Sequence, residues 1–288
     1  MISSANGQSA PSRWPGASFV WPERTLVMGV LNLTPDSFFD GGRYVQPEAA
    51  LRRALAMVEE GADFLDIGAE STRPGAAPVE AAEQWQRLEP VLKALAGRVT
   101  VPISVDTTLA SVAELALDAG GAAINDVSGL ADPRMADVVA AADAGLIVMH
   151  MQGIPHSMQQ DPSYEDVVSE VSAFLSARAE RAVRSGVVRE SVIVDPGIGF
   201  GKTLDHNLAL LRSMRVLASA GWPVLMGVSR KSFIGALGGA PVEARLPGSI
   251  AAALSVSRDG AAMVRVHDVA ETVQALRVQR SIAGGVLE

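Results

Sequence analysis

Short apolar stretches alternate with longer segments along most of this chain. Eight stretches rich in Val, Ile, Leu and Met, each too short for a helix, occupy residues 25–32, 62–69, 101–107, 122–128, 145–151, 192–197, 224–229 and 263–269. A segment whose apolar positions have helical spacing follows each of them. Buried strands that alternate with helices are typical of a parallel sheet. Eight such units in 288 residues predict an α/β fold, a single (β/α)₈ TIM barrel.

The segments between the strands predict helices at residues 47–60, 80–96, 109–119, 132–143, 165–185, 205–220, 242–259 and 269–280. Six glycines stand between a helical segment and the next strand, namely Gly61, Gly120, Gly145, Gly186, Gly221 and Gly260. Glycine adopts at little cost the left-handed conformation that ends many helices, so we expect helix C-caps there.

Two loops are longer than the usual connection from a strand to a helix. Residues 34–46 follow the first strand, and residues 70–79 follow the second. Long loops at the carboxyl-terminal face of a barrel commonly act as lids. No linker interrupts the alternating pattern, so we expect one barrel domain over residues 25–288 after a flexible tail at 1–24.

Composition narrows the class of partner. The net charge of −8 argues against nucleic acid and against an anionic membrane surface as partners. No run of about 20 apolar residues predicts a membrane span, and the polar first 24 residues do not resemble a signal peptide. The chain has no cysteine, which removes thiol nucleophiles, disulfides and thiolate metal sites. We therefore expect a cytoplasmic protein.

Polar residues gather where the predicted strands end. They are Asp66, Asp106, Asn125, Asp126, Asp195, Arg265 and His267. Because the carboxyl ends of barrel strands share one rim, we expect these side chains to meet there. The alternative for any one of them is a polar network that only organises the barrel. Asp66 and Asp126 are the strongest candidates for such a structural role.

The residue types at this rim suit two kinds of ligand. One set combines carboxylates, an amide and an ammonium group: Asp106, Asn125, Asp195 and Lys231. It suits a flat heterocycle, because a carboxylate accepts two parallel N–H bonds and an amide both donates and accepts. Lys231, Arg265 and His267 form a cationic set that suits a phosphate. Ser232 opens the next helix, where N–H groups are free to bind an anion, whereas Arg230 is interpreted as a solvated loop charge.

The segment DPGIGFGKT, residues 195–203, is rich in glycine but has neither the Walker spacing nor the dinucleotide fingerprint. We interpret it as a rigid turn that aims Asp195 and places Phe200 as an apolar wall. It does not predict ATP binding.

Eight motifs follow one another over about residues 25–270. They are MGVLNLTPDSFFDGG (28–42), GADFLDIGAESTRPGA (61–76), VPISVDT (101–107), INDVSG (124–129), MHMQGIP (149–155), DPGIGFGKT (195–203), GVSRKSFIG (227–235) and RVHDV (265–269). In this order they resemble the dihydropteroate synthases, a pterin-binding family of folate biosynthesis. The resemblance implies condensation of 6-hydroxymethyl-7,8-dihydropterin diphosphate with 4-aminobenzoate, giving 7,8-dihydropteroate and pyrophosphate, with Mg²⁺. It also implies a homodimer and competition by sulfonamides.

The resemblance implies roles for the residues at matching positions. The pterin pocket is formed by Asp106, Asn125, Met149, Asp195 and Lys231. Asn32 lies near the metal and the diphosphate, which also meets Arg265 and His267. The surface that receives 4-aminobenzoate contains Thr72, Arg73, Phe200 and Ser232. The residues implied to be catalytic are Arg73, Asp106, Lys231, Arg265 and His267.

Two positions depart from the family pattern. Phe39 stands where the family more often has Ser, and Ala69 replaces a common Gly, but neither change removes a polar ligand. Three other functions are less consistent with the residues. A pterin-binding methyltransferase domain would not need the loops 34–46 and 70–79, and a catalytically silent paralogue would lose its ligands first. A sugar-phosphate barrel enzyme would not need the residues that suit a heterocycle.

Overall fold

The computed structural model describes residues 12–14, 17–19, 24–33, 39–40, 44–45, 47–71 and 75–284. Eight strands in this part of the chain form one parallel sheet: β3 (Leu26–Asn32), β6 (Phe64–Gly68), β7 (Ile103–Asp106), β8 (Ala123–Asp126), β9 (Gly145–Met149), β10 (Val192–Asp195), β11 (Leu225–Gly227) and β12 (Met263–Val266). Their order in the sheet is β10-β9-β8-β7-β6-β3-β12-β11. A parallel bridge between Val194 and Val224 joins the two end strands, so the sheet closes. The predicted TIM barrel is confirmed.

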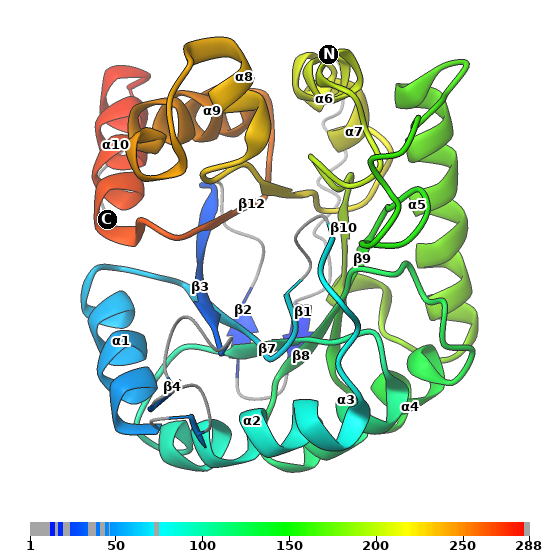
Figure 1. Cartoon of the computed structure of the whole chain (residues 1–288), viewed down its shortest axis with the longest axis vertical. Coiled ribbons are helices and arrows are strands. Elements are labelled where there is room, and N and C mark those ends of the chain that lie inside the picture. Colours follow the sequence, from blue (N-terminus) through cyan, green and yellow to red (C-terminus); the bar gives the residue numbers. More distant parts are fainter. Residues whose placement is uncertain are drawn as a thin grey trace, which may run out of the picture.

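The helices lie around the outside of the strands (Figure 1). In the described residues they are α1 (Pro47–Glu59), α2 (Ala81–Leu95), α3 (Ala110–Asp118), α4 (Met135–Ala141), α5 (Val167–Arg184), α6 (Leu204–Arg212), α7 (Met214–Ala218), α8 (Ser232–Gly238), α9 (Leu246–Arg258) and α10 (Val269–Ile282). The helix predicted at 205–220 is divided into α6 and α7, because the backbone leaves the helical region at Ser213. The helix predicted at 242–259 begins as a 3₁₀ turn, Val242–Ala244, ahead of α9. Each of these described helices is too short or too polar to cross a membrane.

Five of the six predicted glycine C-caps are confirmed, because Gly61, Gly120, Gly186, Gly221 and Gly260 all have positive φ. The prediction for Gly145 is wrong. Gly145 is the first residue of β9, where its N–H donates to the carbonyl oxygen of Ala122 over 3.0 Å. The left-handed residue after α4 is Asp143, with φ 49°.

The alternation of side chains along the strands builds two layers inside the barrel. The lower layer is an apolar cluster of Leu26, Met28, Phe64, Ala123, Ile147, Ile193, Leu225 and Met263. A residue two positions further along a strand points to the same side, one layer higher. Two residues after Phe64, Ala123, Ile193 and Met263, the strands carry Asp66, Asn125, Asp195 and Arg265. The barrel therefore carries a polar layer above an apolar floor.

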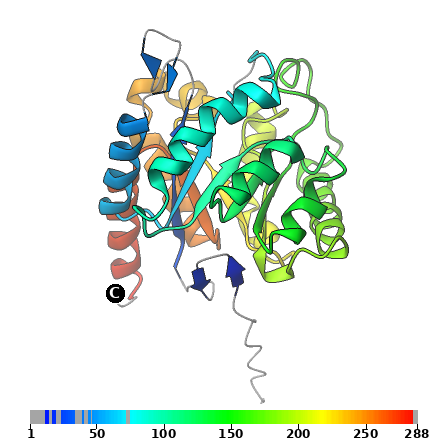
Figure 2. The same cartoon turned by 90° about the horizontal axis from the view of Figure 1, so that it is seen from below.

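Two small antiparallel hairpins accompany the barrel. Within the segment predicted as a tail, β1 (Ser12–Trp14) pairs with β2 (Ala17–Phe19), and β1 lies beside the 3₁₀ turn that precedes β10. Within the predicted loop 34–46, β4 (Phe39–Asp40) pairs with β5 (Tyr44–Val45). Figure 2 shows the two hairpins at opposite ends of the molecule. The sequence pattern predicted neither hairpin.

The closed interior makes the lower layer sensitive to loss of volume. Phe64 is 2% exposed and is enclosed by strands. We predict that Phe64→Ala lowers the free energy of unfolding by about 3–5 kcal/mol, measured by urea denaturation. Leu115 on α3 is 42% exposed, and Leu115→Ala should change that free energy by less than about 0.5 kcal/mol. Equal losses in the two variants would contradict a tightly filled interior.

Candidate active site

A buried network centred on Arg265 joins four strands at the carboxyl-terminal rim. The Nε atom of Arg265 donates to Oδ2 of Asp66 over 2.6 Å, and its Nη2 atom donates to Oδ2 of Asp106 over 3.2 Å. The amide of Asn125 donates to the same Oδ2 atom of Asp66 over 3.1 Å. Parallel pairing of β6, β7 and β8 sets Asp106 beside Asn125. The barrel thus brings together four of the side chains that the sequence placed at one rim.

Asp66 and Asp126 make the contacts of structural residues, as the sequence indicated. Asp66 is fully buried and orients both Arg265 and Asn125. The carboxylate of Asp126 accepts from the backbone N–H and the hydroxyl of Ser128 and from the N–H of Leu130. It therefore shapes the loop after β8 and does not join the network around Arg265.

Burial sets the protonation of this network. It raises the pKa of Asp106 to about 7, and the negative charge of Asp66 adds to the effect while Arg265 opposes it. Burial alone would lower the pKa of Arg265, but the carboxylates of Asp66 and Asp106 raise it above its ordinary value. Arg265 is therefore a permanent, largely enclosed cation shared by two carboxyl groups.

Asp195 ends β10 and is held by the turn that follows it. Its Oδ1 atom accepts from the backbone N–H of Gly197 over 2.7 Å. Burial raises the pKa of Asp195, whereas the Gly197 N–H and the cations Lys231 and Arg265 lower it. In register across β9 and β10, Asp195 pairs with the buried Met149, as expected for two residues of one pocket.

Lys231 brings the loop after β11 to the turn after β10. It is the N-cap residue of α8, which places Ser232 at the first position of that helix. Its Nζ atom lies 4.2 Å from the ring centroid of Phe200. Burial lowers the pKa of Lys231 to about 8, although the negative charges of Asp195 and Asp106 raise it. The predicted turn thus places Phe200 under the ammonium group.

The structure changes two expectations about cations. Burial, Arg265 and Arg230 lower the pKa of His267 to about 4, so this residue is neutral at pH 7 and not part of a cationic set. Its Nδ1 atom lies 3.0 Å from Oγ of Ser229. Arg230 is not a solvated loop charge, because it donates to both oxygens of Asp268 over 2.9 and 2.5 Å. That pair joins the loops after β11 and β12, and the sequence pattern did not reveal it.

The remaining predicted residues are placed only in part. Asn32 ends β3 at the same rim, opposite Gly68 of β6. Thr72 and Arg73 lie outside the described residues, as does the side chain of Phe39. Ala69 is buried, and its carbonyl oxygen accepts from Arg87 of α2 over 2.8 Å.

Sequence reasoning missed a residue that supports the rim from outside. Gln84 of α2 is fully buried and donates to Oε2 of Glu70 over 3.0 Å and to the carbonyl oxygen of Val79 over 2.9 Å. It also accepts from the hydroxyl of Thr107, next to Asp106, over 2.9 Å. One amide therefore ties both ends of the loop 70–79 to β7. A glutamine on the apolar side of a predicted helix was the available signal.

The fold and the rim define a class: a TIM-barrel enzyme with a buried, charged site at the carboxyl ends of its strands. Residues 28–267 match the family described as pterin binding enzyme. The chain belongs to this family, and within it to the dihydropteroate synthases, as three comparisons with known proteins illustrate.

Relatives match almost the whole chain. A dihydropteroate synthase of Neisseria meningitidis serogroup C is 47% identical over 275 residues, which is 93% of this chain and 97% of that protein. The crystal structure of the Yersinia pestis dihydropteroate synthase with a sulfonamide drug complex has a TM-score of 0.89 and 41% identity. It covers 95% of this chain and 99% of its own. The Xanthomonas albilineans dihydropteroate synthase in complex with 7,8-dihydropteroate has a TM-score of 0.81 and 41% identity, covering 91% and 95%.

Asp66 and Asp106 both contact Arg265, so after burial the charge of Asp66 is the next largest cause of the raised pKa of Asp106. The other charged groups around Asp106 are Arg265, Glu70, Asp126 and Lys231. We predict that Asp66→Asn lowers the pKa of Asp106 from about 7, because the ionised form no longer faces a second negative charge. Carbon-detected NMR titration of the Asp106 carboxyl measures this shift.

The same variant should change how stability depends on pH. A carboxyl whose pKa is raised on folding contributes stability that is lost as pH rises from about 4 to about 7. Asp66→Asn should therefore flatten the fall in stability over this range. Asp63→Asn is the control. Asp63 precedes β6, at the other end of that strand from the rim, and pairs there with Arg24. An unchanged Asp106 titration in Asp66→Asn would refute the coupling.

Proposed function

We propose that this chain condenses 6-hydroxymethyl-7,8-dihydropterin diphosphate with 4-aminobenzoate, releasing 7,8-dihydropteroate and pyrophosphate. The observation that carries the proposal is a buried acceptor without a partner. Because Asp66 accepts from the Asn125 amide nitrogen, the Oδ1 atom of Asn125 is turned away from it. Within the described residues this buried oxygen has no hydrogen-bond partner. A ring N–H of the pterin supplies one.

The remaining ring contacts fall to residues of the same rim. Asp195 is a buried carboxylate that accepts from only one described N–H group, at Oδ1, and can accept from the donor edge of a pterin. Lys231 donates to a ring carbonyl, and Met149 provides an apolar wall. A ligand without matching donors would leave these buried groups unpaired, which gives the site its selectivity.

Diphosphate leaves from the exocyclic CH₂ group of the pterin, where the electron-rich reduced ring stabilises a developing cation. Arg265 stabilises the departing negative charge, and His267 takes part as a neutral hydrogen-bond donor through Nε2. The C–O bond breaks, the amine nitrogen of 4-aminobenzoate forms the new C–N bond, and the resulting arylammonium loses a proton to water. A weakly basic arylamine that attacks a cation-like carbon needs no dedicated general base.

Magnesium is part of this proposal, and the donor set suits it. The described residues contain no group of three or more His, Asp or Glu side chains that could hold a metal ion. Mg²⁺ commonly binds through one or two protein ligands together with substrate phosphates and water. Asn32 would hold it through its amide oxygen. When bound, the ion supplies positive charge to the diphosphate.

The second substrate is proposed to lie between Phe200 and the start of α8 at Ser232, with Thr72 and Arg73 from the loop 70–79. The position of Lys231 above the Phe200 ring supports this placement, because Lys231 is also proposed to contact the pterin. A cytoplasmic location also belongs to the proposal; the chain has no cysteine and therefore no disulfide that would need an oxidising compartment.

Asp195→Asn tests the site directly. The amide can no longer accept two N–H bonds, so we predict at least a 100-fold loss in kcat/KM, on the order of 2.7 kcal/mol or more. Pyrophosphate release is measured with both substrates and Mg²⁺, with and without a sulfonamide competitor. Asp118→Asn on the exposed end of α3 is the control. No pyrophosphate from the wild-type protein would refute the function, and normal kinetics in Asp195→Asn would refute the pocket.

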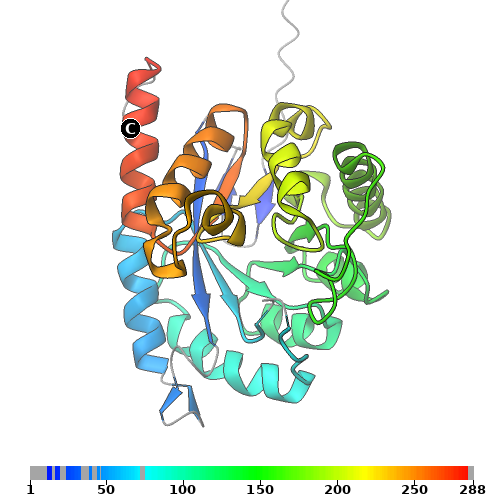
Figure 3. The same cartoon turned by 45° about the horizontal axis from the view of Figure 1, so that its top comes forward.

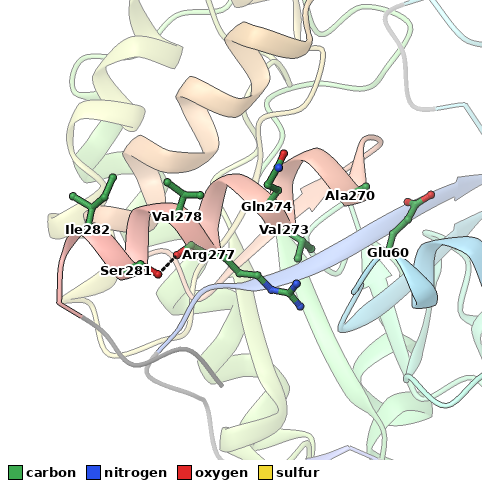
Figure 4. A pocket seen from close by; sticks show the side chains of 8 residues that line it. All are labelled: Glu60, Ala270, Val273, Gln274, Arg277, Val278, Ser281 and Ile282. Atoms are coloured by element: carbon green, nitrogen blue, oxygen red, sulfur yellow. Dashed lines mark hydrogen bonds between the residues drawn. The ribbon is translucent and has the colours of Figure 1, made fainter.

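We also propose that a second copy of the chain covers one flank of the barrel. Figure 3 shows α8, α9 and α10 side by side on this flank. A hollow of about 740 Å³ lies between α6, α8 and α9, and it contains Leu237, which is 60% exposed. A second groove of about 480 Å³ runs along α10, where Val278 and Ile282 are 54% and 82% exposed (Figure 4). Two separate hollows on this flank thus carry exposed apolar side chains, which supports an interface with a second copy there.

Leu237→Asp tests the homodimer. A charge in the hollow should oppose burial against a second copy, so we predict a shift from dimer to monomer in sedimentation equilibrium. Leu115→Asp is the control, because it places the same charge on an exposed leucine of α3, which lies outside this flank. It should leave the molecular mass measured in solution unchanged. A wild-type monomer at all concentrations would contradict the interface.

A further inference from the structure

The glycine-rich turn after β10 contains a lysine that the proposed reaction does not use. Lys202 is 3% exposed, and its side chain points inward from the turn. Its Nζ atom lies 3.0 Å from Nδ1 of His150 and 3.0 Å from each of the carbonyl oxygens of Gly197 and Phe200. A fourth acceptor, the carbonyl oxygen of His150, is 3.4 Å away. The side chain therefore joins the turn to the segment after β9.

The number of close acceptors matches the chemistry of an ammonium group. An ammonium has three hydrogens to donate, and three acceptors lie at 3.0 Å. Burial and the charge of Lys202 lower the pKa of His150 to about 3, so its ring is neutral and accepts at Nδ1. Burial lowers the pKa of Lys202 to about 7, which the negative charge of Asp195 opposes. The hydrogen bonds hold the group in place without a paired carboxylate.

The turn is packed too closely on its neighbour to tolerate extra atoms. Gly197 and Gly201 both have positive φ, 68° and 60°. A Cβ atom at either position would overlap a carbonyl oxygen, that of His150 or that of Gln152. The backbone of Gly197 is thus fixed by contact, and Asp195 with it. Phe200 is held instead by the bond from Lys202 to its carbonyl oxygen and by its own N–H, which donates to the carbonyl oxygen of Gly197 over 3.1 Å.

We propose that Lys202 is a positioning residue for the second substrate: by binding the carbonyl oxygen of Phe200 from beneath, it sets the ring of Phe200 under Lys231, where 4-aminobenzoate is received. This inference rests on the proposed function. It explains why a segment with the residue types of a phosphate-binding loop turns its lysine away from the open rim. Lys202 contacts no reacting atom and acts through Phe200.

A double-mutant cycle tests this role. Wild type, Lys202→Met, Phe200→Ala and the double variant are compared by two measurements. Calorimetry gives the dissociation constant of 6-hydroxymethyl-7,8-dihydropterin, and pyrophosphate release gives kcat and KM for 4-aminobenzoate. We expect Lys202→Met to raise that KM about tenfold and to change the pterin dissociation constant by less than about threefold.

The cycle separates positioning from general support of the fold. With Phe200→Ala already present, Lys202→Met should raise the KM by less than about twofold, because the ring that it positions is gone. Equal effects of Lys202→Met in both backgrounds would overturn the inference, and so would an equal loss for both substrates or an unchanged KM. Tyr164→Phe is the matched control, because the Tyr164 hydroxyl binds Gly201 of the same turn over 2.8 Å and does not hold Phe200.

Circular dichroism and thermal unfolding establish that each variant is folded. If Lys202→Met does not fold, Lys202→Gln replaces it, since its amide retains donors; the same cycle then applies with a smaller rise in KM. If the wild-type protein releases no pyrophosphate, the proposed function itself fails. If the wild type is active and the cycle is additive, only the role of Lys202 fails.

Discussion

The placement of the Arg265 guanidinium inside the mouth of the barrel, where its side chain is only 21% exposed, is the constraint on which the rim depends. A buried charge without partners costs several kcal/mol, so the barrel must supply acceptors for it. Asp66 and Asp106 do so from two neighbouring strands, and Asn125 uses a further lone pair of Asp66. One cation therefore fixes the side-chain positions contributed by three other strands. The same contacts leave the Oδ1 atom of Asn125 without a hydrogen-bond partner among the described residues.

Several groups at the rim have pKa values far from their ordinary values. Burial moves the pKa of Asp106 to about 7, of Lys231 to about 8 and of His267 to about 4. In each case the charged form is disfavoured because water is excluded. A ligand that brings N–H donors to the acceptors and negative charge to the donors offsets part of this cost. The groups that would bind such a ligand are therefore the same groups that would stabilise its negative charge.

Three residues outside the Arg265 network join neighbouring segments of the rim. Gln84 joins both ends of the loop 70–79 to Thr107, directly beside Asp106. Arg230 joins the loops after β11 and β12 through Asp268. Lys202 does the same for the segments after β9 and β10. Each joins neighbouring parts of the rim, so the loops that surround the site are linked in pairs.

The sequence by itself determined the barrel, the positions of its eight strands and the residues of its rim. It could do so because alternation along a strand and helical spacing are local properties, and because parallel strands end at one edge. It also located five glycine turns, although it misplaced the turn at Gly145 and did not predict the break in the helix at Ser213.

Only the tertiary structure decided which partner each polar side chain takes. Arg265 and Asp66 lie 199 positions apart, and no local pattern specifies that pair. The neutral state of His267, the ion pair of Arg230 and the inward direction of Lys202 were likewise beyond a local pattern. Each depends on burial and on neighbours from distant segments, and the closed barrel creates both.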